Sequence, residues 1–255
     1  VDVNYCIIGE SSSYKSKIVF NETSDIQVLS GNTLDLKYLI LSNPCSGLWK
    51  GITVQSGGTL IVDQCIFEGA EFGITALPGS TVKVTNTWFK DCNIGIYVPP
   101  SNGNQQNVNF TGIWGNKFST VNGVPTNDIF TQNQQFMLAG ISINNLQYIE
   151  IGKSGELINE FKNAQNGILS NKSNLIVNNN KFIDIVASPG FPTVGVAVKA
   201  SGDENNYLFM GNTQKNIIEN SEIGVLTSVM GDYIRGNEMT NVGTGIDARY
   251  TNWSD

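Results

Sequence analysis

The sequence predicts an all-β fold, a right-handed parallel β-helix in which coils of three strands stack into a solenoid. Three observations predict it. Asn, Gly, Ser, Thr, Val and Ile dominate the 255 residues and only 15% are charged, which favours strands and turns over helices. Similar segments recur every 22 residues. Within each repeat, short runs of alternating apolar residues are separated by turns rich in Gly, Asn and Ser.

The first strand of the repeat begins with Gly-Ile. Its best copies are residues 51–54, 73–76 and 95–98, each 22 residues after the last. Residues 18–20 (Ile-Val-Phe) are expected to be the earliest copy, and degraded copies begin at Gly140, Gly167, Gly195, Gly224 and Gly245. These copies predict about nine coils. Because inward Ile and Val alternate with outward residues, the predicted outer face of this strand is Thr53, Thr75, Tyr97, Ser142, Leu169, Ala197, Leu226 and Asp247.

Two further strands complete each coil, and both are visible as matching segments. Residues 33–36, 59–62 and 81–84 align as the second strand, and residues 39–41, 65–67 and 87–89 align as the third. Three strands in about 22 residues fit one coil of a β-helix, which buries its inner face only by stacking on its neighbours. The outward residues expected from the alternation are Asp35, Ile61, Lys83 and Ile176 on the second strand and Ile66, Trp88, Lys117 and Lys181 on the third.

A recurring asparagine supports this register. It stands two residues before a bulky apolar residue at Asn116, Asn159, Asn180, Asn216 and Asn237. Stacked Asn side chains can hydrogen-bond to one another and to the turn backbone, which satisfies polar groups at an inner corner. We interpret this ladder as structural.

The ends of the chain and its cysteines are read in the same register. Residues 1–8 overlay residues 60–67, so the chain is expected to start in mid-coil, to lack caps at both ends, and to form a single domain over 1–255 that is a segment of a longer protein. This overlay places Cys6 and Cys65 at equivalent inward positions two coils apart, beyond disulfide reach. Cys92 falls in a turn and Cys45 in a longer one. We expect most cysteines to be buried apolar residues, and a bridge from Cys45 stays open.

Charge and composition exclude several classes of protein. The net charge of −7 argues against nucleic acid as a partner, because phosphates require a basic surface. No apolar run is long enough to predict a membrane span. The chain has no His and no Cys-x-x-Cys pair, so no metal site is predicted.

The motif Trp-x-Gly-Ile-x-Val at residues 49–54, followed by Gly-Gly-Thr-Leu at 57–60, resembles the right-handed β-helix repeat proteins of the pectin-lyase-like superfamily. More narrowly, the chain is similar to secreted or surface proteins of Bacteroidota that leave the cell by type IX secretion. The resemblance implies a secreted or cell-surface location. It also implies a polysaccharide or cell-surface glycan, the rest of the parent chain, or a secretion apparatus as partner. The superfamily includes lyases, hydrolases and adhesins, so the resemblance does not choose an activity.

The residues give little support to an enzyme. The outward face of the first strand carries one carboxylate, Asp247, whereas glycoside hydrolysis generally needs two facing carboxylates. The chain has two arginines, Arg235 and Arg249, and lacks the Gly-His-Gly motif of the superfamily's pectin hydrolases. We therefore predict no catalytic residues. If the chain were a polysaccharide lyase or glycoside hydrolase with an incomplete site, Asp247, Arg249 and Arg235 would be the candidates.

The predicted function is a non-catalytic module that serves as a stalk, an adhesin or a glycan-binding scaffold. Insertions at residues 99–104, 119–137, 186–193 and 201–207 bracket the face that carries Tyr97 and Ser142, which predicts a shallow groove. The predicted ligand-binding residues are the aromatic side chains Tyr97, Trp88 and Tyr207 and the acidic loop residues Asp203 and Glu204. Trp114 is read either as a further sugar-stacking residue or as a core or turn residue. No cofactor is expected, and calcium binding stays open.

Overall fold

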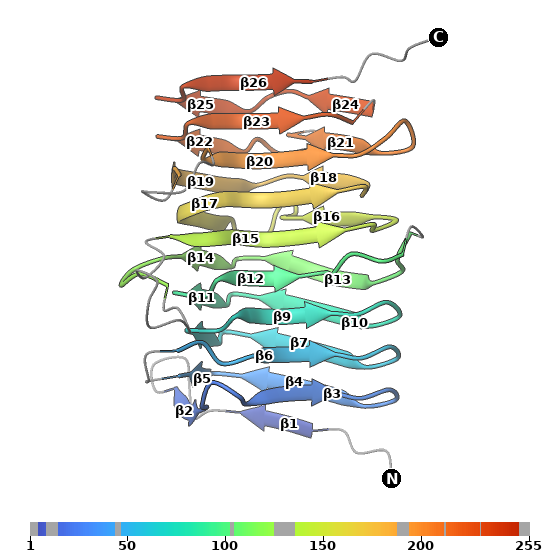
Figure 1. Cartoon of the computed structure of the whole chain (residues 1–255), viewed down its shortest axis with the longest axis vertical. Helices are drawn as coiled ribbons and strands as arrows, with labels where there is room; N and C mark the ends of the chain where they lie inside the picture. The colour runs from blue at the N-terminus through green and yellow to red at the C-terminus, as the bar shows by residue number, and fades with distance from the viewer. Residues whose placement is uncertain are drawn as a thin grey trace.

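The computed structural model describes residues 5–8, 15–43, 47–102, 105–124, 136–187, 194–211, 213–229 and 231–249. It is an all-β parallel solenoid of about eight turns, close to the nine expected, and the described residues contain no helix. The termini lie at opposite ends of the stack (Figure 1). In Figure 1 the near strands run to the right and the far strands to the left while the chain climbs, so the winding is right-handed.

The strands stack in three rows, and every pairing between them is parallel. The first row, at the front of Figure 1, consists of β3 (Asp25–Val28), β6 (Gly51–Val54), β9 (Phe72–Ala76), β12 (Ile94–Tyr97), β15 (Met137–Asn144), the second half of β17 (Asn159–Asn171), β20 (Val196–Ser201), β23 (Ile223–Thr227) and β26 (Thr244–Ala248).

The second row lies at the back and is divided into two sheets. One sheet contains β1 (Tyr5–Ile8), β4 (Thr33–Lys37), β7 (Thr59–Asp63), β10 (Thr81–Thr85) and β13 (Asn109–Trp114); the other contains β16 (Ile149–Ile151), β18 (Leu175–Val177), β21 (Tyr207–Met210) and β24 (Gly231–Ile234). The third row consists of β2 (Ser16–Val19), β5 (Leu39–Ser42), β8 (Ile66–Glu68), β11 (Trp88–Lys90), β14 (Lys117–Ser119), the first half of β17, β19 (Asn180–Ile185), β22 (Ile217–Glu219) and β25 (Glu238–Thr240).

Alternation along each strand builds the core, as the sequence predicts. On β7, Leu60 and Val62 are fully buried, whereas Ile61 between them is partly exposed. The same alternation holds at Trp88 and Lys117 on the third row, whose neighbours Phe89 and Phe118 are buried. The predicted outward residues of the second and third rows are therefore confirmed.

A column of stacked aromatic rings explains why Gly-Ile recurs. The rings of Phe89, Phe118 and Phe161 stack with centroids 4.9 and 4.7 Å apart. A glycine of the first row lies against each ring: a Cβ placed on Gly95 would lie 2.6 Å from Phe118 Cδ1. In the coils that carry these rings, the repeat therefore requires glycine at this position, because a side chain would displace the aromatic column.

The predicted asparagine ladder is present; Asn116, Asn159, Asn180 and Asn216 are buried, and Asn237 is partly buried. Asn159 Nδ2 donates to Asn180 Oδ1 at 2.9 Å, and Asn180 Nδ2 donates to Asn216 Oδ1 at 3.0 Å. Asn216 Nδ2 in turn donates to Asn237 Oδ1 at 2.8 Å, while Asn116 Oδ1 accepts from the backbone N–H of Thr87 at 3.0 Å. Each coil thus satisfies polar groups of the next one.

Two predicted registers in the first coils are wrong. Residues 18–20 are not the earliest first strand: Ile18 pairs with Leu41 of the third row, and the earliest first-row strand is β3, which pairs with β6. The aromatic column decides this register, because Phe20 stacks on Trp49 with ring centroids 4.4 Å apart. Cys6 pairs with Asp35 in the second row, so it is not equivalent to Cys65.

The overlay of residues 1–8 failed because an apolar run with alternation fits two rows equally well. In the pairing of β1 with β4, Ile7 stands opposite Leu36, a buried residue of the second row. Cys65 and Cys92 are free and buried, as predicted, and burial raises the pKa of the Cys92 thiol to about 12. Cys45 lies outside the described residues.

Candidate functional site

The outer face of the first row presents one side chain per coil, and in its C-terminal half it is hollowed. The paired residues along this face are Gln27, Thr53, Thr75, Tyr97, Ser142, Leu169, Lys199, Leu226 and Asp247.

Lys199 replaces the predicted Ala197 in this series, which corrects the register of β20. Val198 pairs with Ile168 and Lys199 with Leu169, so Ala197 takes the place that glycine holds in other coils and is fully buried. The prediction is wrong for two reasons. Val196, Ala197 and Val198 are all apolar, so alternation does not identify the outward residue. In addition, the Gly-Val pair at 195–196 matches the Gly-Ile pattern of the repeat, two residues before the position that pairs with it. The correction places an exposed lysine in the middle of the face.

Two adjoining depressions form a shallow groove lined by residues of β15, β17, β20 and β23 and by Arg249, which follows β26; it is here called the front groove. Each has a volume of about 200 Å³. The first is lined by Ser142, Ile143, Asn144, Leu169, Ser170, Asn171, Lys199 and Ser201, and the second by Lys199, Ala200, Ser201, Leu226, Thr227, Ser228 and Arg249. Because Lys199 and Ser201 line both, the depressions are continuous.

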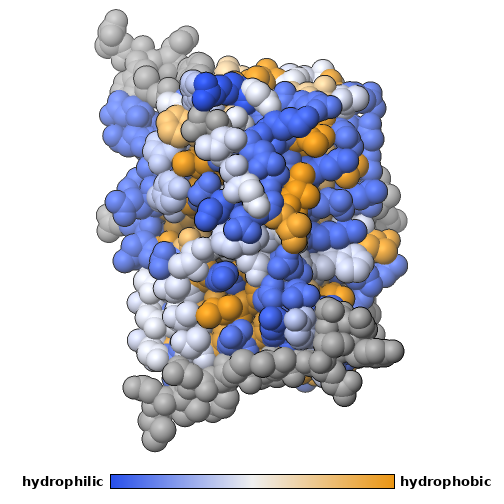
Figure 2. All heavy atoms as spheres, turned by 180° about the vertical axis from the view of Figure 1, so that it is seen from behind, coloured by the Kyte–Doolittle hydropathy of each residue, from blue (hydrophilic) through white to orange (hydrophobic). Residues whose placement is uncertain are grey.

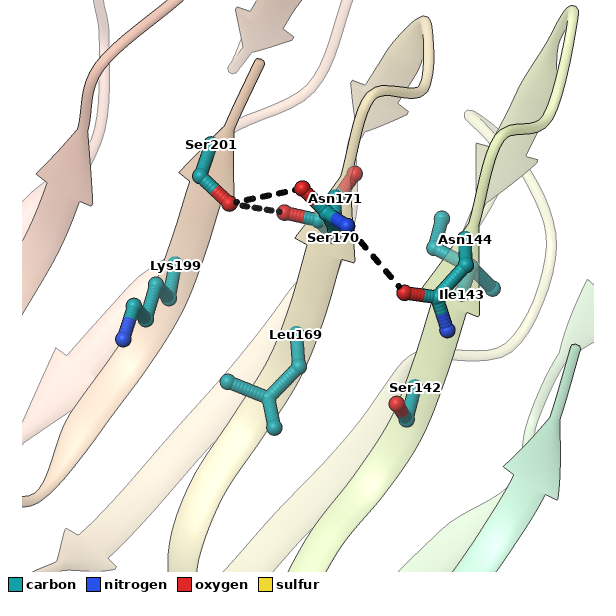
Figure 3. A pocket seen from close by; sticks show the side chains of 8 residues that line it. All are labelled: Ser142, Ile143, Asn144, Leu169, Ser170, Asn171, Lys199 and Ser201. Atoms are coloured by element: carbon teal, nitrogen blue, oxygen red, sulfur yellow. Dashed lines mark hydrogen bonds between the residues drawn. The ribbon is translucent and has the colours of Figure 1, made fainter. Parts of the chain in front are cut away.

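One rim of the front groove is a row of hydrogen-bonding side chains, one from each coil (Figure 3). Asn171 Nδ2 donates to Asn144 Oδ1 at 3.4 Å, and Ser201 Oγ lies 3.4 Å from Asn171 Oδ1. Asn144 Nδ2 donates to the carbonyl of Val98 at 2.9 Å, which fixes the start of the row. Leu169 lies beside this rim and supplies an apolar surface (Figure 3). We call Asn144, Asn171 and Ser201 the polar rim.

The insertion after β12 supports the rim. Gln106 Nε2 donates to the carbonyls of Pro99 and Asn144 at 2.7 and 2.8 Å, which ties this loop to β15. Residues 103–104, 125–135 and 188–193 of the predicted insertions lie outside the described residues.

The structure does not bring the predicted ligand-binding aromatics together. Tyr97 lies on the first row beside Ser142, and its ring stacks on Phe72 with centroids 4.6 Å apart. Trp88 lies on the third row, where its Nε1 donates to Ser119 Oγ at 2.7 Å. Tyr207 lies on the second row. The three side chains therefore occupy three different faces.

The predicted acidic loop follows β20 and stays local. Asp203 and Glu204 are both exposed, and Asp203 Oδ1 accepts from the backbone N–H of Asn205 at 3.0 Å, a turn hydrogen bond. Within the described ranges, no cluster of three or more His, Cys, Asp or Glu side chains has the geometry to hold a metal ion.

Of the catalytic candidates, two meet and one does not. Arg249 Nη2 lies 2.6 Å from Asp247 Oδ2, and this hydrogen bond holds the pKa of the Asp247 carboxyl below its usual value. Arg249 also lines the front groove. Arg235 follows β24 on the second row, where its guanidinium lies 4.7 Å from the ring centre of Tyr233.

Sequence reasoning missed Lys199 and the polar rim. The signal for the rim was available: Asn144, Asn171 and Ser201 each stand two residues after an outward residue of the first row, so they face the same side.

No family model, curated protein or solved structure matches this chain. In the described part of the chain, no helix is both long and apolar enough to pass through a membrane.

Proposed function

We propose that this chain is a non-catalytic glycan-binding module and that a polysaccharide chain lies along the front groove. The polar rim carries the proposal: Asn144, Asn171 and Ser201 offer one hydrogen-bonding side chain per coil beside the apolar surface of Leu169. Amide and hydroxyl groups both donate and accept hydrogen bonds, as sugar hydroxyls do. Since coils repeat at about 4.8 Å, the rim offers such groups at regular intervals along the stack.

The shape of the groove suits an extended ligand. It is shallow and crosses four strands of the first row, which is the kind of long surface that solenoids use for binding. Leu169 and Leu226 lie in the same outward series as Ser142 and Lys199, so apolar and polar contacts alternate along it. This mixture matches a sugar chain, whose rings have apolar faces and polar edges.

The setting of the module is part of the proposal. The Trp-x-Gly-Ile-x-Val motif at 49–54 supports kinship with the pectin-lyase-like superfamily and with secreted or surface proteins of Bacteroidota. We accordingly propose a secreted or cell-surface location, a role as adhesin or stalk, and a polysaccharide or cell-surface glycan as partner. Binding through the rim requires no cofactor, because its groups are amides and hydroxyls.

The alternative, a polysaccharide lyase or glycoside hydrolase, has one observation in its favour. Asp247 and Arg249 form an ion pair at the end of the front groove, where a carboxylate base and a cation would meet a bound chain. The lowered pKa of Asp247 weakens it as a general base at neutral pH, because a base works best with a pKa near the operating pH.

The test is a binding and cleavage screen of the chain on a polysaccharide panel, with and without calcium, followed by the Lys199→Ala and Asn171→Ala variants. We expect binding without cleavage, weakened at least about fivefold by each substitution. Lys17→Ala, at an exposed lysine on β2, is the matched control and should bind like the parent chain. Equal binding by all variants would refute the front groove as the site, and new reducing ends or unsaturated products would establish the enzyme instead.

A further inference from the structure

A second site candidate lies on the back of the solenoid, where the second row is interrupted between β13 and β16. Figure 2 shows this side, on which apolar side chains break up a mostly hydrophilic surface. In β13 the pairing with β10 shifts between Val82 and Lys83, so Thr111 is an extra residue. The bulge and the gap between the sheets leave a depression of about 100 Å³. We call it the back depression; its lining includes Phe110, Thr111, Trp114, Tyr148, Glu150 and Lys153.

The indole of Trp114 forms the floor of this depression. Gly112 occupies the outward place that pairs with Lys83, and a Cβ on Gly112 would lie 2.5 Å from Trp114 Cη2. The ring therefore folds back over the glycine and lies along the outer surface of the sheet. Trp114 is partly exposed, so it is not a core residue, and it lies in strand β13, so it is not part of a turn. Glycine at 112 is what allows an indole to lie flat here.

Two lysines flank the ring without carboxylate partners. Lys83 Nζ lies 5.8 Å and Lys153 Nζ 5.5 Å from the indole centre. Among the described residues neither has a carboxylate oxygen within 4.0 Å. Six other lysines do have one: Lys37, Lys50, Lys90, Lys117, Lys181 and Lys215. Glu150 also lines the depression but lies more than 4.0 Å from both lysines, so two cations face one carboxylate beside the partly exposed indole, and this excess of positive charge favours an anionic ligand.

Trp88 provides an internal comparison. It too has two lysines near its ring, Lys117 at 4.9 Å and Lys90 at 5.9 Å. There, however, Glu160 and Glu68 pair with these lysines, at 3.5 and 2.5 Å, and cancel their charge. The lysines beside the two tryptophans therefore differ in whether a carboxylate pairs with them.

We propose that the back depression binds an anionic sugar residue, a pyranose that carries a carboxylate or a sulfate group. Its ring stacks on Trp114 and its anionic group contacts Lys83 and Lys153. The Tyr148 phenol, 49% exposed and facing the same depression, is placed to donate to a ring hydroxyl. Partial burial raises the pKa of this phenol further above neutral pH.

The site goes beyond the front groove, because it lies on another row of strands and shares no residue with it. A chain with ligand sites on two faces can hold two glycan strands at once, and where the two strands are linked in one network, binding at one site raises the effective concentration at the other.

The experiment is 19F NMR of the chain labelled with 5-fluorotryptophan, with the Trp114→Phe variant assigning one resonance and Trp88→Phe another. The probes are dextran sulfate, polygalacturonate and neutral dextran. We expect the Trp114 resonance to shift with one or both anionic polymers and not with dextran, while the Trp88 resonance stays. The two anionic polymers decide between sulfate and carboxylate.

The Lys83→Ala/Lys153→Ala double variant should weaken this binding at least tenfold, whereas Lys117→Ala and Lys199→Ala should leave the Trp114 response unchanged. An unmoved Trp114 resonance would overturn the proposal, as would equal shifts at Trp88 and Trp114, which would indicate general attraction to polyanions. A double variant that binds like the parent chain would also overturn it. The front groove is tested separately, because Lys199→Ala should reduce binding only there.

Discussion

Ile74 and Ile246 occupy the same position of the repeat, one in an interior coil and one on β26, and they differ completely in burial. The register runs without a break from Ile74 through Ile96, Ile141, Ile168, Val198 and Val225 to Ile246. Ile74 is fully buried, whereas 51% of Ile246 is exposed. An inward residue of this fold is therefore buried by the coils on both sides of it, and the local sequence supplies only the direction in which it points.

The largest expected effect is at Ile74. Ile74→Asp places an unpaired charge between β6 and β12, and we expect a loss of about 3–5 kcal/mol, comparable to the whole stability of a small domain. Ile246→Asp should cost about 1 kcal/mol or less, because water reaches this position. Denaturant melts of the two variants measure the difference. Equal losses would mean that the two positions have the same surroundings in solution.

A smaller effect is expected at the glycines of the same row. In Gly95→Ala the new methyl group would lie 2.6 Å from both Phe118 Cδ1 and the carbonyl oxygen of Gly140, so we expect a loss of about 1–3 kcal/mol. Gly245→Ala is the matched control, since its methyl group would meet only Met239 Sδ at 3.6 Å, an ordinary contact. Thermal melts with near-UV circular dichroism report both stability and the aromatic column. A Gly95→Ala chain as stable as Gly245→Ala would contradict the packing role of these glycines.

The smallest expected effect is on the stability that the chain loses at acidic pH, when its carboxylates are protonated. Burial by itself raises the pKa of Asp63, but hydrogen bonds from Asn86, Gln64 and Thr85 outweigh it and leave the pKa lowered. Asp63 Oδ1 accepts from Thr85 and Asn86 of the next coil, both at 2.9 Å. Asp247 is instead hydrogen-bonded to Arg249, two residues further along the chain and just after β26.

Because the folded pKa of Asp63 is lowered, its stabilisation is present above the unfolded pKa of about 3.9 and disappears as the pH falls through the folded value. Asp63→Asn should therefore lose less stability than the parent chain between roughly pH 5 and pH 2. Asp247→Asn should follow the parent curve closely, since its bond spans two residues and does not join coils. Urea melts across this pH range test the prediction. Superimposable curves for Asp63→Asn and the parent chain would contradict it.

The sequence predicted which strands form each row better than it predicted the register in which neighbouring strands pair. The three strands, the direction of their side chains and the asparagine ladder follow from alternation and from a repeat that is nearly exact between residues 51 and 98. The predicted register is wrong at residues 1–8, 18–20 and 195–198, because an apolar run there is compatible with more than one register. There the aromatic column and the pairing of neighbouring coils choose between them.

The sites were harder to predict than the fold. Tyr97, Trp88 and Tyr207 were grouped because they are aromatic, but they lie on different rows. The importance of Trp114 depends on Gly112, on the bulge at Thr111, on Lys83 of β10 and on Lys153, which follows β16, and the sequence repeat does not predict that these residues come together. Such a site forms where the repeat is interrupted, and the periodicity of the sequence does not predict which side chains come together there.

The aromatic column has a consequence for how such a chain can change length in evolution. From Phe67 to Phe182, each ring meets the next at nearly the same distance, with centroids 4.7 to 5.1 Å apart. A duplicated coil would find on either side the partner that its parent already had, so insertion or deletion of whole coils needs no compensating change elsewhere. A coil added within the front groove would also lengthen the groove by one strand, so duplication there would change the length of glycan that it can hold.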